Sequence, residues 1–445
     1  MARTLAEHGT WGINAGEFAS ATSSPLYTAI LALGLGAFGA HEQVSLFLNV
    51  AAGAVVCWLV AAFARDLRDR ATSLAFVLVC GPLPYLASLG MEHVLHAALV
   101  LALALVGLAA PFRNGRFALL ALAVAGVLTR YETLFVLAPL MMLLARRGRW
   151  MDGLLVGGAG ALAVGTYGAW SWSQGGLVIP NSILMKSALA GGWETLWKDN
   201  LYEGAPVLLL VAGAAAAAAV DRRQEGHALL FGVAALLHLA FARIGWLYRY
   251  EGYLIIWGGV IAVPPLLRAV KGPQLLLLAA ILIPSGFRAW RASVDFVAAS
   301  RCIHDNDVVL AKMVARDLPD VTLAVHNIGA LAWFSDATVV DVAGLATDEV
   351  TRLHLGNQLT GQTFGSLLAR RGVQLAYTDV GWLAADPPPG LEEIAVLSYQ
   401  TPVPGRRAKT RLSITPLGDV ARLSAALRSL PPGGDRYSVE WSIVP

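Results

Sequence analysis

Charged side chains are scarce in this chain of 445 residues, because Asp, Glu, Lys and Arg together make up only 14% of it. A soluble domain carries about 25%. Hydrophobic residues make up 56%. This imbalance excludes an ordinary soluble protein and favours several membrane-spanning helices joined to a soluble part. The formal net charge of +3 is too small to indicate a nucleic-acid partner.

Cysteine is also rare, with only Cys57, Cys80 and Cys302 in the whole chain. Their spacing excludes a disulfide framework and a C-x-x-C motif. Cys57 and Cys80 lie inside apolar runs, where we interpret them as packing residues. The sequence also lacks an internal repeat and the paired broken helices that are typical of transporters.

Apolar runs long enough to approach a membrane span occupy the first two-thirds of the chain. They predict a polytopic α-helical membrane protein with a C-terminal extracytoplasmic α/β domain. The predicted parts are a juxtamembrane segment at 1–43, a transmembrane domain at 44–287 and a soluble domain at 288–445. The candidate spans are 44–64, 71–88, 93–111, 117–129, 133–145, 151–172, 205–220, 228–247, 252–268 and 273–287.

Arginine and lysine gather in every second loop between these spans, which marks those loops as cytoplasmic. The remaining loops and the C-terminal part are then predicted outside. The same parity places residues 1–43 outside, so the run Leu26–Ala40 reads as a half-membrane or interfacial helix. An ordinary span with a shifted count is the alternative. The basic residues are Arg65, Arg68, Arg70, Arg113, Arg116, Arg146, Arg147, Arg149, Arg222, Arg223, Arg268 and Lys271.

The C-terminal part shows short apolar runs of the kind that form buried strands. Val321–Val325, Val339–Val342 and Val373–Tyr377 are predicted strands, and Leu368–Arg371 is a predicted helix end. Proline-rich and glycine-rich loops are expected at 387–390 and 431–434.

Three charged clusters interrupt the apolar part on the predicted outer side, where the positive-inside rule does not place cations. They are Thr129–Glu132, Pro180–Ser187 and Arg249–Tyr253. Arg130 and Arg249 each belong to an Arg-Tyr-Glu triplet, and ionisable groups near membrane depth are costly and tend to be functional. Lys186 lies near a predicted helix start. A cation beside a helix N-terminus predicts a site that binds an anion. The alternatives are a solvated lysine and simple juxtamembrane ion pairs.

Glu92, His93 and His96 form a further outer group. Glu92 can orient a hydroxyl or pair with an arginine. A shared metal is disfavoured because the spacing is no zinc motif, and His96 is interpreted as a buried or interfacial histidine.

Several stretches resemble motifs of the GT-C membrane glycosyltransferases, with most similarity to actinobacterial arabinofuranosyltransferases of the AftB type and their bacterial relatives. Asn14–Glu17 with Thr22–Tyr27 resembles their N-x-G-E … T-S-P-L-W stretch, and Pro180–Lys186 resembles their P-N-T … A-K loop. Gly90–Glu92 and Thr129–Glu132 look like G-M-E-T and T-R-P-E. Residues 327–345 are similar to an outer C-terminal domain of some members.

The resemblance implies an enzyme of the bacterial inner membrane that moves a sugar from a polyprenyl-phosphate donor to a cell-envelope glycan or lipid acceptor. The leaving group is a lipid phosphate, whose growing charge needs cations in place. Lys186 and Arg249 are then expected to bind the phosphate, with support from Arg130. No cofactor or metal is expected. The residues expected to orient hydroxyls or these cations are Glu92, Glu132, Asn181, Tyr250 and Glu251.

One departure from the family pattern concerns the general base. The family's acidic motif ends its first helix, and the matching position precedes residue 1, so we expect a misplaced start or a truncated chain. Glu7 or Glu17 would substitute only by chance. The alternative function is a non-catalytic lipid-glycan binding or transport protein on the same fold. In the soluble part, His326, Asp336, Asp341 and Asp379 are expected at strand ends, as surface groups or as acceptor contacts.

Overall fold

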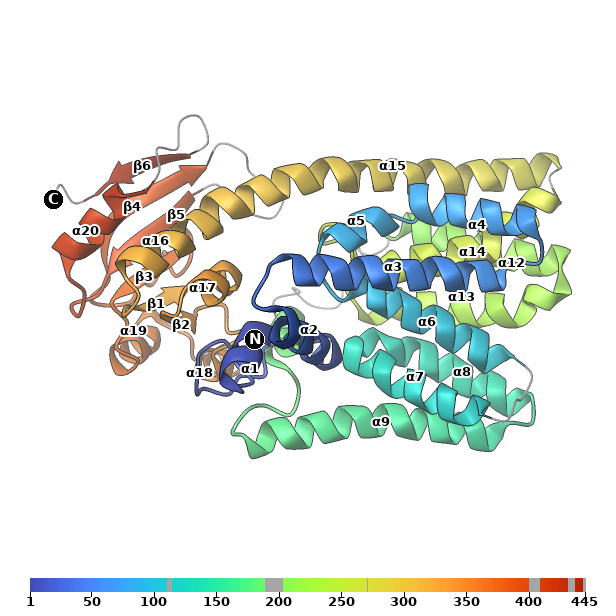
Figure 1. The fold of residues 1–445 in the computed structure, drawn as a ribbon, viewed down its shortest axis with the longest axis horizontal. Helices are drawn as coiled ribbons and strands as arrows, with labels where there is room; N and C mark the ends of the chain where they lie inside the picture. The colour runs from blue at the N-terminus through green and yellow to red at the C-terminus, as the bar shows by residue number, and fades with distance from the viewer. Residues whose placement is uncertain (110–113, 189–202, 270, 400–408, 431–436, 443–445) are drawn as a thin grey trace. The chain divides into compact units, whose positions relative to one another are not determined.

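Figure 1 shows the computed structural model of the chain, which describes residues 1–109, 114–188, 203–269, 271–399, 409–430 and 437–442. The described chain is mostly helical, and a mixed sheet forms near its C-terminus. Both features confirm the sequence-based expectation. The predicted loop at 431–434 lies outside the described residues.

The helices have the following bounds in chain order: α1 Ala2–His8, α2 Pro25–Phe38, α3 Gln43–Phe63, α4 Leu67–Val79, α5 Leu83–Ser88, α6 His93–Leu108, α7 Gly115–Thr129, η1 Tyr131–Thr133, α8 Leu134–Arg146, α9 Trp150–Ser173, α10 Asn181–Ala188, α12 Ala205–Val220, η2 Arg222–Gln224, α13 Glu225–Phe241, α14 Gly252–Arg268, α15 Gly272–Ile303, η3 His304–Val308, α16 Val309–Asp317, α17 Ile328–Phe334, α18 Asp348–Leu355, α19 Gly361–Arg370 and α20 Val420–Arg428. The strands are β1 Thr322–Val325, β2 Thr338–Asp341, β3 Leu375–Asp379, β4 Glu392–Tyr399, β5 Lys409–Ile414 and β6 Tyr437–Trp441.

The chain forms two compact units. The helical unit comprises 23–169 and 190–294, and the sheet unit comprises 1–22, 170–189 and 295–445. The sequence-based division into 1–43, 44–287 and 288–445 follows hydropathy, whereas these units gather segments by packing. The sheet unit therefore unites three segments that are remote in sequence.

Four described helical stretches are long and apolar enough to cross a membrane by length and composition: Gln43–Phe63, Trp150–Ser173, Arg222–Phe241 and Gly272–Asp317. Helices α2, α6, α7, α12 and α14 are apolar but shorter. Helix α2 has 14 residues, or about 21 Å at 1.5 Å per residue, which is less than a hydrocarbon core of about 30 Å.

Three predicted spans need correction. The run at 228–247 is helical only to Phe241, where α13 ends, and residues 245–247 lie in a left-handed turn. The run at 71–88 is two helices, α4 and α5, because Pro82 has no backbone N–H to continue α4 and disfavours helical geometry at Gly81. The run at 273–287 is only the first half of α15, which continues to Ile303. Its second half is more charged, so a window that seeks apolar residues stops too early.

The sheet unit holds a six-stranded sheet in the order β2-β1-β3-β5-β4-β6. Strand β1 runs parallel to β2 and β3, and the remaining pairs are antiparallel. One face packs on α16 and α20, through residues such as Leu310, Val314 and Leu427. The other packs on α18 and α19, through residues such as Val350 and Phe364. Burial on both faces explains the apolar central strands.

Candidate functional site

The two Arg-Tyr-Glu triplets lie at helix ends of the helical unit, as the sequence predicts. Arg130 directly follows α7 in an extended conformation, and this break lets Tyr131 and Glu132 begin η1. Arg249 lies four residues after Gly245, a glycine with positive φ, in the stretch that leads into α14. Arg130 therefore follows an apolar helix and Arg249 precedes one, and each lies in irregular backbone.

The Arg130 guanidinium lies between two carboxylates. It donates from Nη1 to Glu92 Oε1 at 2.6 Å, from Nε to Glu132 Oε2 at 3.2 Å, and from Nη2 to Glu132 Oε1. Its side chain is only 6% exposed. Of the two roles open to Glu92 from sequence, the structure shows the pairing with an arginine. Because Arg130 is already neutralised twice, its geometry fits a group that holds the site in shape.

Tyr250 joins this ion cluster to Arg249. Its buried ring lies 5.2 Å from the Arg130 guanidinium carbon and 5.3 Å from that of Arg249. Cations over an aromatic face are attracted by the ring quadrupole. Tyr250 therefore holds two cations near each other that would otherwise repel.

Arg249 differs from Arg130 in its partners. Its Nη1 contacts Met91 Sδ at 3.1 Å, and a thioether sulfur is only a weak acceptor. Its Nε is buried without a hydrogen-bond partner. In the described part of the chain, no carboxylate forms an ion pair with Arg249. The Arg249 guanidinium thus keeps at least one N–H donor without an acceptor. A binding site for an anionic oxygen requires such a donor.

A left-handed turn presents Arg249. Gly245, Trp246, Leu247 and Tyr248 have φ angles of 75°, 44°, 59° and 58°. Left-handed geometry costs about 1–2 kcal/mol for each residue with a side chain. Such strain persists only when the surroundings impose it, and it gathers at functional sites. The sequence gives no signal for the three residues after the glycine.

Three contacts hold the turn in place. The backbone N–H of Gly245 donates to Glu251 Oε2 at 2.9 Å, and the Tyr85 hydroxyl donates to Leu247 O at 2.5 Å. The Arg288 guanidinium lies 5.1 Å from the Tyr248 ring centre. Arg288 also pairs with Glu251, and both side chains are buried. Sequence reasoning named Glu251 but missed Arg288, which lies beyond the predicted end of its span.

His93, which the sequence suggested only as a disfavoured metal ligand, also lies next to Tyr250. Its ring is buried beside Tyr250, at 6.0 Å between centres, and its Nε2 has no hydrogen-bond partner. The nearest carboxylate oxygen, Oε1 of Glu92, is 3.9 Å away. His96 is buried as expected and hydrogen-bonds the Thr133 hydroxyl at 3.1 Å. His93 and Arg249 thus each bring an unsatisfied buried nitrogen to the surroundings of Tyr250.

Asn181 and Lys186 belong to the sheet unit, in α10. Helix α10 begins at Asn181. The Asn181 amide donates to Asp348 Oδ1 at 2.5 Å, and its backbone N–H donates to Ser20 O at 2.9 Å. Asn181 thereby joins α10 to α18 and to the N-terminal segment. The side chain of Lys186 lies outside the described residues, so its predicted phosphate contact stays a prediction.

The Asn14–Glu17 motif has a definite role within the sheet unit. The Asn14 amide pairs with both backbone groups of Val339, at 2.9 Å each, and so extends the edge strand β2 by one side chain. The same amide donates to Glu17 at 2.8 Å, and Glu17 pairs with Arg371 at 2.7 Å. The motif therefore fastens the N-terminal segment to the sheet and covers part of an open edge.

We expect Asn14→Ala to destabilise the sheet unit by about 1–3 kcal/mol, because three hydrogen bonds are lost at about 0.5–1.5 kcal/mol each and some are replaced by water. Chemical denaturation followed by the fluorescence of Trp333 and Trp382 measures this change. Gln362→Ala, an exposed amide on α19, serves as the matched control. Equal midpoints for the two variants would contradict the role given to Asn14.

The strand-end residues of the sheet unit have structural partners. Asp341 ends β2 and accepts hydrogen bonds from the backbone N–H groups of Ala343 and Ala346 at 2.9 and 2.8 Å. Burial nevertheless raises the pKa of its carboxyl to about 6. His326 Nδ1 accepts from the Asp379 backbone N–H at 3.2 Å. These contacts shape the loops after the parallel strands. Asp336 pairs with Arg3 at 2.9 Å.

Within the described ranges, no three His, Cys, Asp or Glu side chains are placed to hold a metal ion. Among comparisons with known proteins, a family described as a domain of unknown function (DUF8728) matches residues 299–415. This match falls within the sheet unit and covers about a quarter of the chain. No curated protein and no solved structure matches the chain.

Proposed function

We propose that this protein is an integral membrane glycosyltransferase of the GT-C type, which moves a sugar from a polyprenyl-phosphate donor to an acceptor hydroxyl on the extracytoplasmic face of the bacterial inner membrane. Arg249 carries the proposal, because it is a preorganised cation with buried donor capacity and no paired carboxylate in the described chain. The leaving group of such a donor is a phosphate, whose negative charge grows as the glycosidic bond breaks. A guanidinium fixed in advance stabilises that charge.

The surface of the helical unit supports a membrane location. Large apolar side chains are exposed along α3, α9 and α15, although such surface is rare on soluble monomers. Lipid tails cover such surfaces in a bilayer. Examples of these exposed residues are Phe47, Trp58, Leu162, Leu276, Ile283 and Phe287.

The composition of the sheet unit supports the proposed topology. Segments that pack into one compact unit lie on the same side of any membrane that the chain crosses. The segments 1–22, 170–189 and 295–445 form one unit, and the arginine pattern independently predicts all three outside. Between the first two segments, this requires an even number of crossings. The six predicted spans from 44–64 to 151–172 already give an even number. A crossing by α2 would make the number odd, so α2 is favoured as a helix that enters the membrane without crossing it.

In the proposed reaction, Arg249 binds the donor phosphate and Tyr250 keeps it beside Arg130. Glu92 and Glu132 fix Arg130 and leave that side of the site slightly negative, which suits the sugar hydroxyls as hydrogen-bond donors. Glu251 and Arg288 maintain the left-handed turn.

The proposal is tested with purified full-length protein in lipid nanodiscs. A panel of radiolabelled polyprenyl-phosphate sugars is incubated with cell-envelope glycan fragments, and transfer is followed by chromatography. We expect transfer from one donor, with release of polyprenyl phosphate. Binding of polyprenyl phosphate without transfer would favour the alternative, a lipid-glycan binding or transport protein. Absence of both would refute the phosphate site.

A further inference from the structure

A second candidate site is a small cavity of about 120 Å³ within the sheet unit. Helix α1 and the segment after it form one side, and the end of α17 with the start of β2 forms the other. The cavity has room for several waters or for one end of a small ligand. The wall residues that matter here are Arg3, Glu7, His8 and Asp336.

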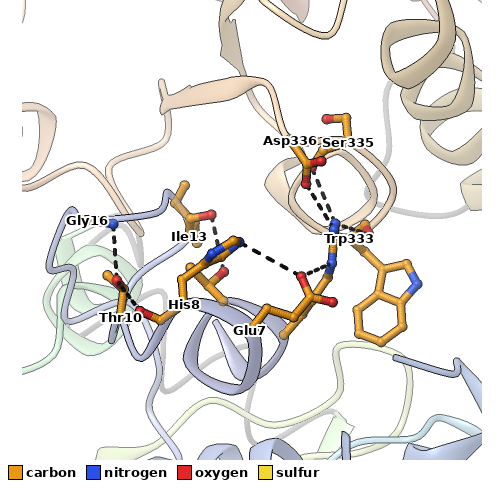
Figure 2. Close-up of polar contacts among 10 residues, drawn as sticks. Glu7, His8, Thr10, Ile13, Gly16, Trp333, Ser335 and Asp336 are labelled. Atoms are coloured by element: carbon orange, nitrogen blue, oxygen red, sulfur yellow. Dashed lines mark hydrogen bonds and ion pairs between the residues drawn. The ribbon is translucent and has the colours of Figure 1, made fainter. Parts of the chain in front are cut away.

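The Arg3 guanidinium connects α1 to the segment at Trp333 and Asp336, and all of its nitrogen atoms take part in these contacts. Its Nε pairs with Glu7 Oε2 at 2.8 Å, and its Nη2 pairs with Asp336 Oδ1 at 2.9 Å. Its Nη1 donates to Trp333 O at 2.7 Å. Figure 2 shows these contacts between α1 and the turn that carries Asp336. Arg3 therefore has little capacity left for an anionic ligand, and its role is to fix two carboxylates.

Arg3 contacts only one oxygen of each carboxylate. Glu7 uses Oε2 and Asp336 uses Oδ1, and neither Oε1 of Glu7 nor Oδ2 of Asp336 has a hydrogen bond from a described residue. The His8 ring lies 3.9 Å from Glu7 and is half exposed. Two carboxylates against one guanidinium give the wall a net charge of about −1 at pH 7.

We propose that this cavity binds a primary ammonium group carried on a small hydroxylated molecule, such as an amino sugar. The net negative wall repels anions, and the two free oxygens accept from an N–H donor at charge-assisted strength. Arg3 between the carboxylates disfavours a bare metal cation. Because Arg3 holds both carboxylates in place, little ordering is needed when the ligand binds. This inference goes beyond glycosyl transfer and does not depend on it.

The test uses full-length protein in detergent and ligands that differ in charge on one skeleton. Glucosamine, N-acetylglucosamine and glucuronate are titrated at pH 7 and observed by saturation-transfer NMR and calorimetry. We expect glucosamine to bind at least about tenfold more tightly than N-acetylglucosamine, which lacks the charge, and glucuronate not to bind. Ethanolamine serves as a further probe, because it carries the ammonium without the sugar ring and so distinguishes a lipid headgroup from a sugar.

Variants then locate the binding. Glu7→Gln with Asp336→Asn keeps the shape and removes both charges, so we expect glucosamine affinity to fall about tenfold. Asp320→Asn is the matched control, because Asp320 is an exposed carboxylate that pairs with Arg422 in the same unit. Thermal unfolding checks that the double variant folds. Equal affinity for the double variant and the control, or equal binding of all three sugars, would overturn the proposal.

Discussion

Arg249→Gln should weaken the binding of polyprenyl phosphate by about 10- to 100-fold, because hydrogen bonds to a charged group contribute about 1.5–3 kcal/mol. The loss follows from the geometry, in which the guanidinium reaches no carboxylate of the described chain and keeps a buried Nε without a partner. Scintillation proximity with labelled polyprenyl phosphate in nanodiscs measures the affinity directly, without the need for turnover.

Two further variants make this result specific. Arg249→Lys keeps the charge but lacks the planar fork, so it should recover only part of the affinity. Arg223→Gln removes an exposed arginine from η2 on the predicted cytoplasmic side and should leave binding unchanged. If Arg249→Gln bound the lipid as tightly as the Arg223 control, Arg249 would not be the phosphate ligand, whatever the activity of the protein.

Breaking the Glu251–Arg288 pair should have the largest effect on stability. Arg288→Met leaves a buried carboxylate without its cation, which costs about 3–5 kcal/mol in comparable cases. Glu251 is only 1% exposed, so water cannot easily replace the lost partner. Thermal unfolding of the detergent-solubilised protein measures the loss. The left-handed turn should loosen as well, so affinity for polyprenyl phosphate should also fall.

The double variant Glu251→Gln with Arg288→Met separates charge burial from other effects. It leaves neither charge, and the glutamine oxygen can still accept from the Gly245 backbone. We therefore expect it to be more stable than Arg288→Met alone. Arg316→Met is the control, because its pair with Asp317 is on the surface and should matter little. If the double variant were the less stable of the two, an uncompensated charge would not explain the loss.

Hydropathy predicted the helix positions well and the connections poorly. Helices such as α3 and α14 follow their apolar runs within a residue or two, because a long apolar run in a helix needs no information from elsewhere in the chain. The break at Pro82 was also visible in the sequence, yet a window average concealed it. The extension of α15 past residue 287 was missed because its second half carries more charged residues, so a search for apolar runs ends before the helix does.

The sequence predicted which residues belong to the candidate site but only some of the contacts between them. The pairing of Glu92 with an arginine was one of two options, and the structure supplies the partner, Arg130. The left-handed turn before Arg249 had no local signal except Gly245, since tertiary contacts from Tyr85, Glu251 and Arg288 impose it. Long-range contacts of this kind leave no periodicity in a single sequence.

The bond between Asn14 and Val339 spans 325 positions of the chain, and this has a consequence for biosynthesis. A ribosome adds about 5–20 residues each second, so the first segment waits tens of seconds before the strand that receives it has been made. Closing so long a loop comes late and slowly. The segment that carries Asn14 should therefore stay open to protease until β2 has been made, and a nascent chain that stops before β2 should leave it open to cleavage.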